Sequence, residues 1–279
     1  MKPFYFDIET IPSQDPAIRA DILAGIKAPG QFKKPESIAA WLEENRDAEA
    51  EAEWLKTSFD GGAGQIVCIG FADGDGKAYS YIPGDLSRAE ERSTIEAFFC
   101  ALTDAGHRTL VGHNIIGFDL PFIWKRCMVL DIKPPAIFPR NPKPWSELVQ
   151  DTMLLWDGQQ RAGGSMERIC RLLGIPGKGD FGGADVWPAI RDGRFAEVAE
   201  YCRGDIERTR AMFKRMTFAE QTAAIAAPLQ GDPGDDTTPA ITPAVTAAQP
   251  ADMDAPWVLP TDIPAPAVRP RAVLTEANF

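Results

Sequence analysis

The sequence has few of the residues that build zinc and redox sites. Its 279 residues include only five cysteines, at positions 68, 100, 127, 170 and 202, and two histidines, His107 and His113. The cysteines are too widely spaced for a CxxC metal site, and the histidines lack the spacing of paired ligands. The cysteines are scattered and odd in number, which also argues against a disulfide framework. We therefore predict a reducing compartment.

Long hydrophobic runs are absent too, so we expect no transmembrane helix. Asp7 and Glu9 come too early for the apolar core of a secretory signal. Acidic residues outnumber basic ones by 40 to 29, and the net charge of -11 argues against a protein that coats nucleic acid. The segment 108–178, with ten basic and six acidic residues, is locally basic within this acidic protein. We therefore expect a cytoplasmic protein with no membrane partner.

Composition divides the chain near residue 228. The last 52 residues hold ten of the 24 prolines and only two basic residues. Such a segment buries too little apolar surface to offset the entropy lost on ordering, so we predict a disordered Pro/Ala/Asp-rich tail at 228–279. Its one apolar island, Trp257–Leu259, indicates either a docking motif for a protein partner or an unselected patch in a linker.

The remaining residues, 1–227, have the apolar spacing of an α/β domain. Alternation over 3–9 predicts a strand with Phe4, Phe6 and Ile8 on one face and Asp7 and Glu9 on the other. Further strands are expected at 65–73, 77–83, 109–111 and 148–155, and helices at 88–104, 120–130, from Ser165 to Gly174, and at 195–216. This order predicts a mixed sheet flanked by helices.

Residues 30–62 interrupt the alternation between the first strand and the hairpin. Many acids and scattered apolar residues there predict a helical insertion. Its tryptophans, Trp41 and Trp54, have two interpretations. They either stack on a base, as aromatic residues do in single-strand binding sites, or pack the insertion onto the body.

Acidic residues at three distant positions are the best candidates for chemistry. Asp7 and Glu9 share a strand face, and two carboxylates so close together are unfavourable unless a cation lies between them. Their oxygen atoms suit Mg²⁺ or Mn²⁺ better than zinc. Tyr201 and Asp205 share one face of the last expected helix. Asp119 opens a helix after a short strand, an exposed place suited to function.

These segments resemble a known family. FDIET at 6–10, GHNIIGFDLPFI at 112–123 and YCRGD at 201–205 are similar to the three motifs of DEDD-type 3′–5′ exonucleases. More narrowly, they resemble the proofreading exonuclease of family B DNA polymerases and its stand-alone bacterial relatives. The resemblance covers residues 1–220, apart from the insertion at 30–62.

The resemblance implies an RNase H-like fold and hydrolysis with two divalent ions, Mg²⁺ or Mn²⁺. Asp7 would bridge both ions, Glu9 and Asp205 would complete the first, and Asp119 would hold the second. Tyr201 marks the tyrosine subtype, DEDDy. A phenol with a pKa near 10 is a poor base at neutral pH, so we assign Tyr201 to orienting the attacking water.

The resemblance also implies substrate contacts. Thr10 would bond the terminal nucleotide and Ile11 would press on its base. Asn114 would position the substrate or Asp119, or would cap the turn before the helix. Lys178, in the loop Gly177–Asp180, could reach a phosphate, although this loop lacks the Ser or Thr that follows the lysine of a nucleoside triphosphate site.

We therefore predict a metal-dependent exonuclease acting on 3′ ends of single-stranded DNA, in repair or end-trimming. Basic residues of 108–178 would follow the phosphates. Three alternatives stay open: an RNA exonuclease with the same acids, an endonuclease of the same broad fold, and a non-catalytic nucleic-acid binding module. The full set of acids and the tyrosine argues against the last.

Overall fold

A five-stranded mixed sheet forms the centre of the structure. The computed structural model describes residues 1–158 and 164–219, so the predicted tail lies outside the described residues. The strands are β1 (Pro3–Ile11), β2 (Gln65–Asp73), β3 (Tyr79–Tyr81), β4 (Thr109–Gly112) and β5 (Val149–Asp151). Their order across the sheet is β3-β2-β1-β4-β5. The central strand β1 pairs antiparallel with β2 and parallel with β4.

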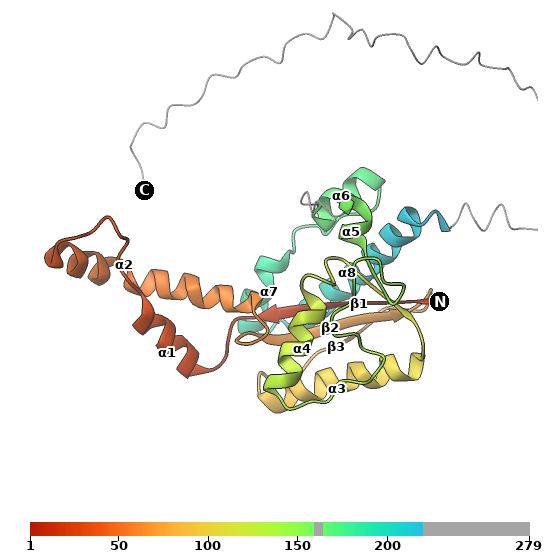
Figure 1. Ribbon diagram of the computed structural model, residues 1–279, viewed down its shortest axis with the longest axis horizontal. Helices are drawn as coiled ribbons and strands as arrows, with labels where there is room; N and C mark the ends of the chain where they lie inside the picture. Colours follow the sequence, from red (N-terminus) through yellow and green to blue (C-terminus); the bar gives the residue numbers. More distant parts are fainter. Residues whose placement is uncertain (159–163, 220–279) are drawn as a thin grey trace, which may run out of the picture. The chain divides into compact units, whose positions relative to one another are not determined.

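Helices cover both faces of this sheet (Figure 1). The helices are α1 (Pro16–Gly25), α2 (Pro35–Lys56), the 3₁₀ turn η1 (Thr57–Phe59), α3 (Arg88–Ala105), α4 (Asp119–Val129), α5 (Thr152–Asp157), α6 (Met166–Leu173), α7 (Gly183–Arg191) and α8 (Phe195–Met216). The helices α3 and α4 lie on one face, and α7 and α8 lie on the other, with α5 and α6 packed against α8. No helix within the described residues is long and apolar enough to cross a membrane.

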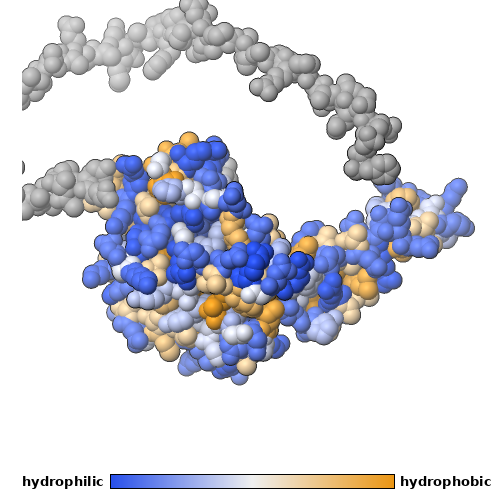
Figure 2. Space-filling model, turned by 180° about the vertical axis from the view of Figure 1, so that it is seen from behind, coloured by the Kyte–Doolittle hydropathy of each residue, from blue (hydrophilic) through white to orange (hydrophobic). Residues whose placement is uncertain are grey.

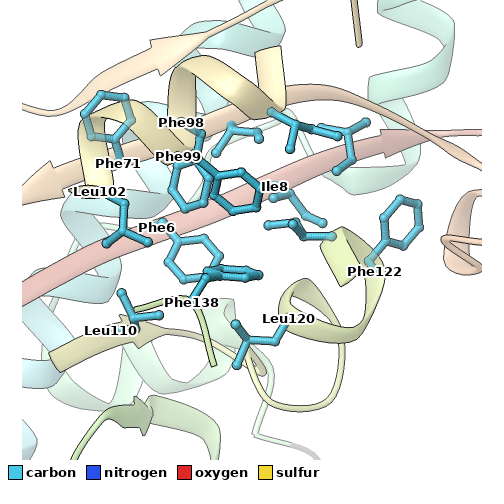
Figure 3. Packing of buried hydrophobic residues seen from close by; sticks show 14 of the residues in the cluster. Phe6, Ile8, Phe71, Phe98, Phe99, Leu102, Leu110, Leu120, Phe122 and Phe138 are labelled. Carbon is cyan, nitrogen blue, oxygen red and sulfur yellow. The ribbon is translucent and has the colours of Figure 1, made fainter. Parts of the chain in front are cut away.

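Alternation along β1 supplies both layers of the core. Phe4, Phe6 and Ile8 point toward α3 and α4, where Phe6 packs against Phe98 and Phe138 (Figure 3). Residues of the opposite parity face α7 and α8. Four of the five cysteines are buried in these layers, whereas Cys100 on α3 is exposed. The apolar face predicted for the first strand is therefore confirmed.

The helices α1 and α2 extend away from the sheet as an arm (Figure 1). They pack against each other, and α2 and η1 fill most of the segment predicted to be a helical insertion. Figure 2 shows a mostly hydrophilic surface, with apolar patches on the arm and on the body. Trp54, at the inner end of α2, is only 4% exposed and lies edge-on to Trp187 of α7 at 5.4 Å. Of the two interpretations, packing onto the body is confirmed for Trp54.

Most predicted elements are confirmed, and three regions differ. The strand expected at 148–155 is wrong beyond Asp151, because the Asp151 side chain accepts a hydrogen bond from Met153 N and starts α5. The helices α1 and α7 were not expected. Proline is unfavourable inside a helix, so Pro188 argues against a helix when only residue propensities are considered. In the structure, Val186, Ala189 and Ile190 of α7 are buried and pack the helix onto the body.

A buried ion pair joins α3 to α4. The Arg126 guanidinium donates two hydrogen bonds to the Glu91 carboxylate, at 2.7 and 2.6 Å, and a third to Gly61 O at 3.3 Å. Glu91 also accepts Ile66 N of β2 at 2.9 Å. Both ionic side chains are almost fully buried, so each depends on the other to offset its lost hydration.

We expect Arg126→Met to destabilise the fold by about 3 kcal/mol, because it leaves the Glu91 carboxylate buried without its cation. The matched control is Lys125→Met, which removes the exposed pair between Lys125 and Asp60 and should cost less than about 1 kcal/mol. Urea unfolding monitored by circular dichroism measures both. Equal losses in the two variants would contradict a structural role for the buried pair.

Candidate active site

The acidic residues of β1 lie beneath the helix α8, at a point where strand and helix approach closely. Asp7 pairs across the sheet with Gly70 of β2, and a Cβ atom at Gly70 would lie only 2.8 Å from Cys202 Sγ of α8. The missing side chain therefore lets α8 lie directly on the strands. One ligand atom each of Asp7, Glu9 and Cys202 lie within 4.8 Å of one another.

Asp119 reaches the same strand from its other edge. The pairing of β1 with β4 ends at Tyr5, which leaves the next N–H groups on that side without a strand partner. Asp119, the first residue of α4, accepts a hydrogen bond from Ile8 N at 3.1 Å and is only 3% exposed. Because β4 ends at Gly112 while β1 continues to Ile11, the Asp119 carboxylate can bond the free N–H group of Ile8.

Asp205 and Tyr201 reach the site from successive turns of α8. Asp205 is 3% exposed, and its two carboxylate oxygens accept hydrogen bonds from Lys178 Nζ at 2.5 Å and Arg208 Nη1 at 2.8 Å. Tyr201 Oη also accepts from Lys178 Nζ, at 2.8 Å. The Tyr201 ring packs against Phe181, with 4.9 Å between ring centroids.

The loop that carries Lys178 is fixed at both sides. Lys178 N donates to Glu167 Oε2 of α6 at 2.9 Å, and Arg208 Nε of α8 donates to Gly177 O at 3.0 Å. Gly177 is required because a Cβ atom there would lie 2.6 Å from Glu167 Oε1. The Lys178 ammonium is therefore held against Asp205 and Tyr201 by an anchored loop.

Burial and neighbouring charges raise the pKa of three of the acids. Burial, followed by the charges of Asp119 and Asp205, raises the pKa of the Asp7 carboxyl well above its usual range. Burial and the charge of Asp7 do the same for the pKa of Glu9. Burial also raises the pKa of Asp119 to about 7, against the opposing effect of its hydrogen bonds. Lys178 acts in the other direction, lowering the pKa of both Asp7 and Glu9.

These donors fit a hard divalent cation. Carboxylate groups held close together in low dielectric are unfavourable unless positive charge is supplied, and oxygen donors suit Mg²⁺ or Mn²⁺. Cys202 is the one soft donor beside Asp7 and Glu9, but hydrogen bonding to Cys68 and burial raise the pKa of the Cys202 thiol well above its ordinary value. The oxygens of the acids are therefore the available ligands.

The residues predicted to contact substrate lie in different surroundings. Thr10 is partly exposed, and its hydroxyl donates to Ser58 O at 2.7 Å. Ile11 is fully buried among residues of β2, α7 and α8, so its side chain packs in the core instead of facing a substrate base. This burial depends on α7, which was not expected. Asn114 has a positive φ of 60° and begins the turn toward α4. Its backbone carbonyl oxygen accepts hydrogen bonds from Gly117 N and Phe118 N.

Asp151 organises that turn. Its carboxylate accepts Asn114 N at 2.9 Å, Ile116 N at 3.2 Å and Met153 N at 3.0 Å, and the residue is 4% exposed. Asp151 thus joins the end of β5 to the segment that leads to Asp119. In the sequence, the signal for this helix N-cap is an aspartate, Asp151, that ends a short strand and comes directly before Thr152, the first residue of α5.

The remaining polar candidates form structural contacts. His113 Nδ1 lies 2.9 Å from the Thr152 hydroxyl. In the locally basic segment, Arg126 is buried in its ion pair and Arg108 is paired with Asp73. Arg126 is therefore not free to follow a phosphate chain, and Arg108 could do so only by leaving Asp73.

We expect Asp151→Asn to destabilise the protein by about 2 kcal/mol, because its amide group would face a backbone N–H that now donates to a carboxylate. Asp85→Asn is the matched control, since Asp85 is exposed and caps only Ser87 N. Urea unfolding of both variants measures the difference. A loss from Asp151→Asn no larger than that from Asp85→Asn would show that the turn does not depend on this carboxylate.

Comparisons with known proteins support a nuclease fold. A family model described as a predicted 3′–5′ exonuclease related to the exonuclease domain of PolB matches residues 64–226, a segment that includes Asp119, Tyr201 and Asp205. The structure is similar to the family B DNA polymerase from the hyperthermophilic archaeon Pyrobaculum calidifontis, with a TM-score of 0.50 and 15% sequence identity. No curated protein matches the sequence.

The similarity to the polymerase concerns the fold, and it covers 78% of this chain but only 24% of the polymerase. The mixed sheet with flanking helices, predicted as RNase H-like, agrees with it. The family model matches more than half of the chain. The protein therefore belongs to the family of predicted 3′–5′ exonucleases related to the exonuclease domain of PolB.

Proposed function

We propose that this protein is a metal-dependent 3′–5′ exonuclease that shortens single-stranded DNA, in repair or end-trimming. The observation that carries the proposal is geometric. Ligand atoms of Asp7 and Glu9 lie within 4.8 Å of the thiol of Cys202 on α8, the helix that also carries Tyr201 and Asp205. Asp119 bonds the backbone N–H of Ile8, between Asp7 and Glu9. Lys178 and Arg208 partner Asp205, and Ile8 N bonds Asp119, but within the described residues no ion pair offsets the lost hydration of Asp7 and Glu9, so placing these two carboxylates together is costly without a bound cation.

The same four acids would hold two divalent ions. In this proposal Asp7 serves both ions, Glu9 and Asp205 complete the first site, and Asp119 supplies the second. When bound, Mg²⁺ or Mn²⁺ would polarise the scissile phosphate and stabilise the charge of the leaving 3′ oxygen. The acids themselves fix where the phosphate is held, and the backbone bond from Ile8 N keeps Asp119 in place.

Tyr201 orients water and phosphate through its hydroxyl. Burial and the charge of Asp205 raise the pKa of Tyr201, so the phenol stays protonated at neutral pH and cannot act as the base. Tyr201 Oη accepts from Lys178, which leaves its own O–H free to donate toward the attacking water. The Lys178 ammonium supplies positive charge where a phosphate would approach.

We expect Asp205→Asn to lower the rate of 3′ shortening of a 5′-labelled single-stranded DNA by more than about a hundredfold with Mn²⁺ present, because changes even to groups behind a metal ligand cost about 10- to 100-fold. The readout is the ladder of shortened products on a denaturing gel. Asp104→Asn, an exposed carboxylate on α3, is the matched control and should cleave like wild type.

A labelled RNA of the same sequence and a circular single-stranded DNA complete the assay. Faster loss of RNA than of DNA would overturn the DNA assignment, and cutting of the circle would indicate an endonuclease. Cleavage by Asp205→Asn at the wild-type rate would contradict the proposed site.

We expect Lys178→Met to bind Mn²⁺ about tenfold more tightly, a gain of about 1.4 kcal/mol, because it removes a cation from the carboxylate cluster. The same variant should cleave DNA more slowly, since Tyr201 loses its partner. Isothermal titration with Mn²⁺ and the cleavage assay measure the two effects, with exposed Lys125→Met as control. Unchanged or weaker Mn²⁺ binding would show that Lys178 does not offset the acids.

A further inference from the structure

We infer that a groove between the arm and α7 binds the terminal base of the single strand, with Phe59 as a stacking surface. This inference rests on the proposed function and extends it to a region outside the shared motifs. The groove has a volume of about 650 Å³, and residues of α2, η1 and α7 line it. That volume is within the range of sites for small organic groups.

The walls of the groove are apolar and come from separate segments. Leu55 of α2 and Phe59 of η1 form one side, and Trp187 of α7 forms the other. Phe118, just before α4, also lines it. Flat and apolar walls suit the faces of a nucleobase, because stacking on aromatic rings is favourable for every base.

Phe59 is the least protected of these side chains. It is 73% exposed, and Leu55 beside it is 40% exposed. Apolar side chains that are exposed together and line a concavity mark a binding surface more than a packing surface. The fold gains little from placing the Phe59 ring there, so the ring is available to a ligand.

Hydrogen bonds fix the backbone that presents Phe59. Thr10 Oγ1 donates to Ser58 O at 2.7 Å, and Ser13 N donates to Thr57 Oγ1 at 2.8 Å. Trp54 Nε1 donates to Ser13 O at 2.8 Å. These bonds join η1 to the end of β1 next to Phe59, so the ring is held on a rigid support, which lowers the entropy cost of binding.

The groove continues from the carboxylate cluster. Ile8, Glu9 and Thr10 line its inner end, and Glu9 is one of the proposed metal ligands. An occupant that reaches Glu9 is therefore joined to the phosphate on which the acids act, which identifies it as the nucleotide at the 3′ end. Lys56 and Arg191 lie at the rim, in exposed ion pairs that contribute little and can exchange for a phosphate.

Binding of a single strand to an inactive protein tests the inference directly. In the full-length Asp205→Asn variant, with Ca²⁺ present, we expect Phe59→Ala to weaken binding of a fluorescent single-stranded DNA about tenfold, as the loss of one stacked base predicts. Phe59→Tyr, which keeps the ring, should restore binding. Trp145→Ala, an equally exposed aromatic outside the groove, is the matched control. Fluorescence anisotropy measures all of them.

A strand whose 3′ nucleotide lacks its base separates stacking from general weakening. It should bind the Phe59-containing protein about tenfold less tightly, and Phe59→Ala should cause no further loss. An equal loss from Phe59→Ala on intact and abasic strands, or no loss at all, would overturn the groove assignment. Failure of the wild-type chain to shorten DNA would instead overturn the proposed function, because the binding assay does not require cleavage.

Discussion

The close contact of α8 with the two central strands determines the geometry of the site. Gly70, the register partner of Asp7, has no side chain to separate the sheet from Cys202 and Ile206. A Cβ atom at this position would lie 2.8 Å from Cys202 Sγ and 3.1 Å from Ile206 Cγ1, so a larger residue would force these side chains or the helix to move. Because α8 carries Asp205 and Tyr201 while β1 carries Asp7 and Glu9, displacement of the helix would separate the two halves of the site. A glycine therefore has as much influence on the chemistry as the acids do.

Assembly of the acids opposes folding, and the surroundings partly compensate. Three carboxylates have a raised pKa because they are removed from water and lie near like charges. Lys178 and Arg208 approach Asp205 from opposite sides, and a backbone N–H bonds Asp119. Both cations bond Asp205, whereas Asp7 and Glu9 form no ion pair within the part of the chain that the structure describes. The negative charge of the cluster is therefore only partly neutralised by the protein's own cations, which favours the binding of an added cation.

Sequence periodicity predicted those parts of the fold that local chemistry controls. Alternation in β1, the serine and glycine that bound α6, and the apolar stripe of α8 all act within a few residues, and these elements are confirmed. The helix α7 contains a proline and begins at a glycine that follows another glycine at the N-cap, so only tertiary contacts reveal it, and with it the burial of Ile11. In the site, the spacing of Asp7 and Glu9 gave their shared face. The position of Lys178 depends on contacts between α6, α8 and a loop, which no local pattern encodes.

The distribution of cysteines has a practical consequence. Four thiols are buried, including Cys202 beside the acids, and Cys100 alone of the five is exposed. It projects from α3, on the side of the sheet opposite α8 (Figure 1). A maleimide dye or nitroxide added to the native polypeptide should therefore attach at one position, remote from the pocket. Distance measurements between that probe and a tagged oligonucleotide could then follow the strand's path without removing any natural cysteine.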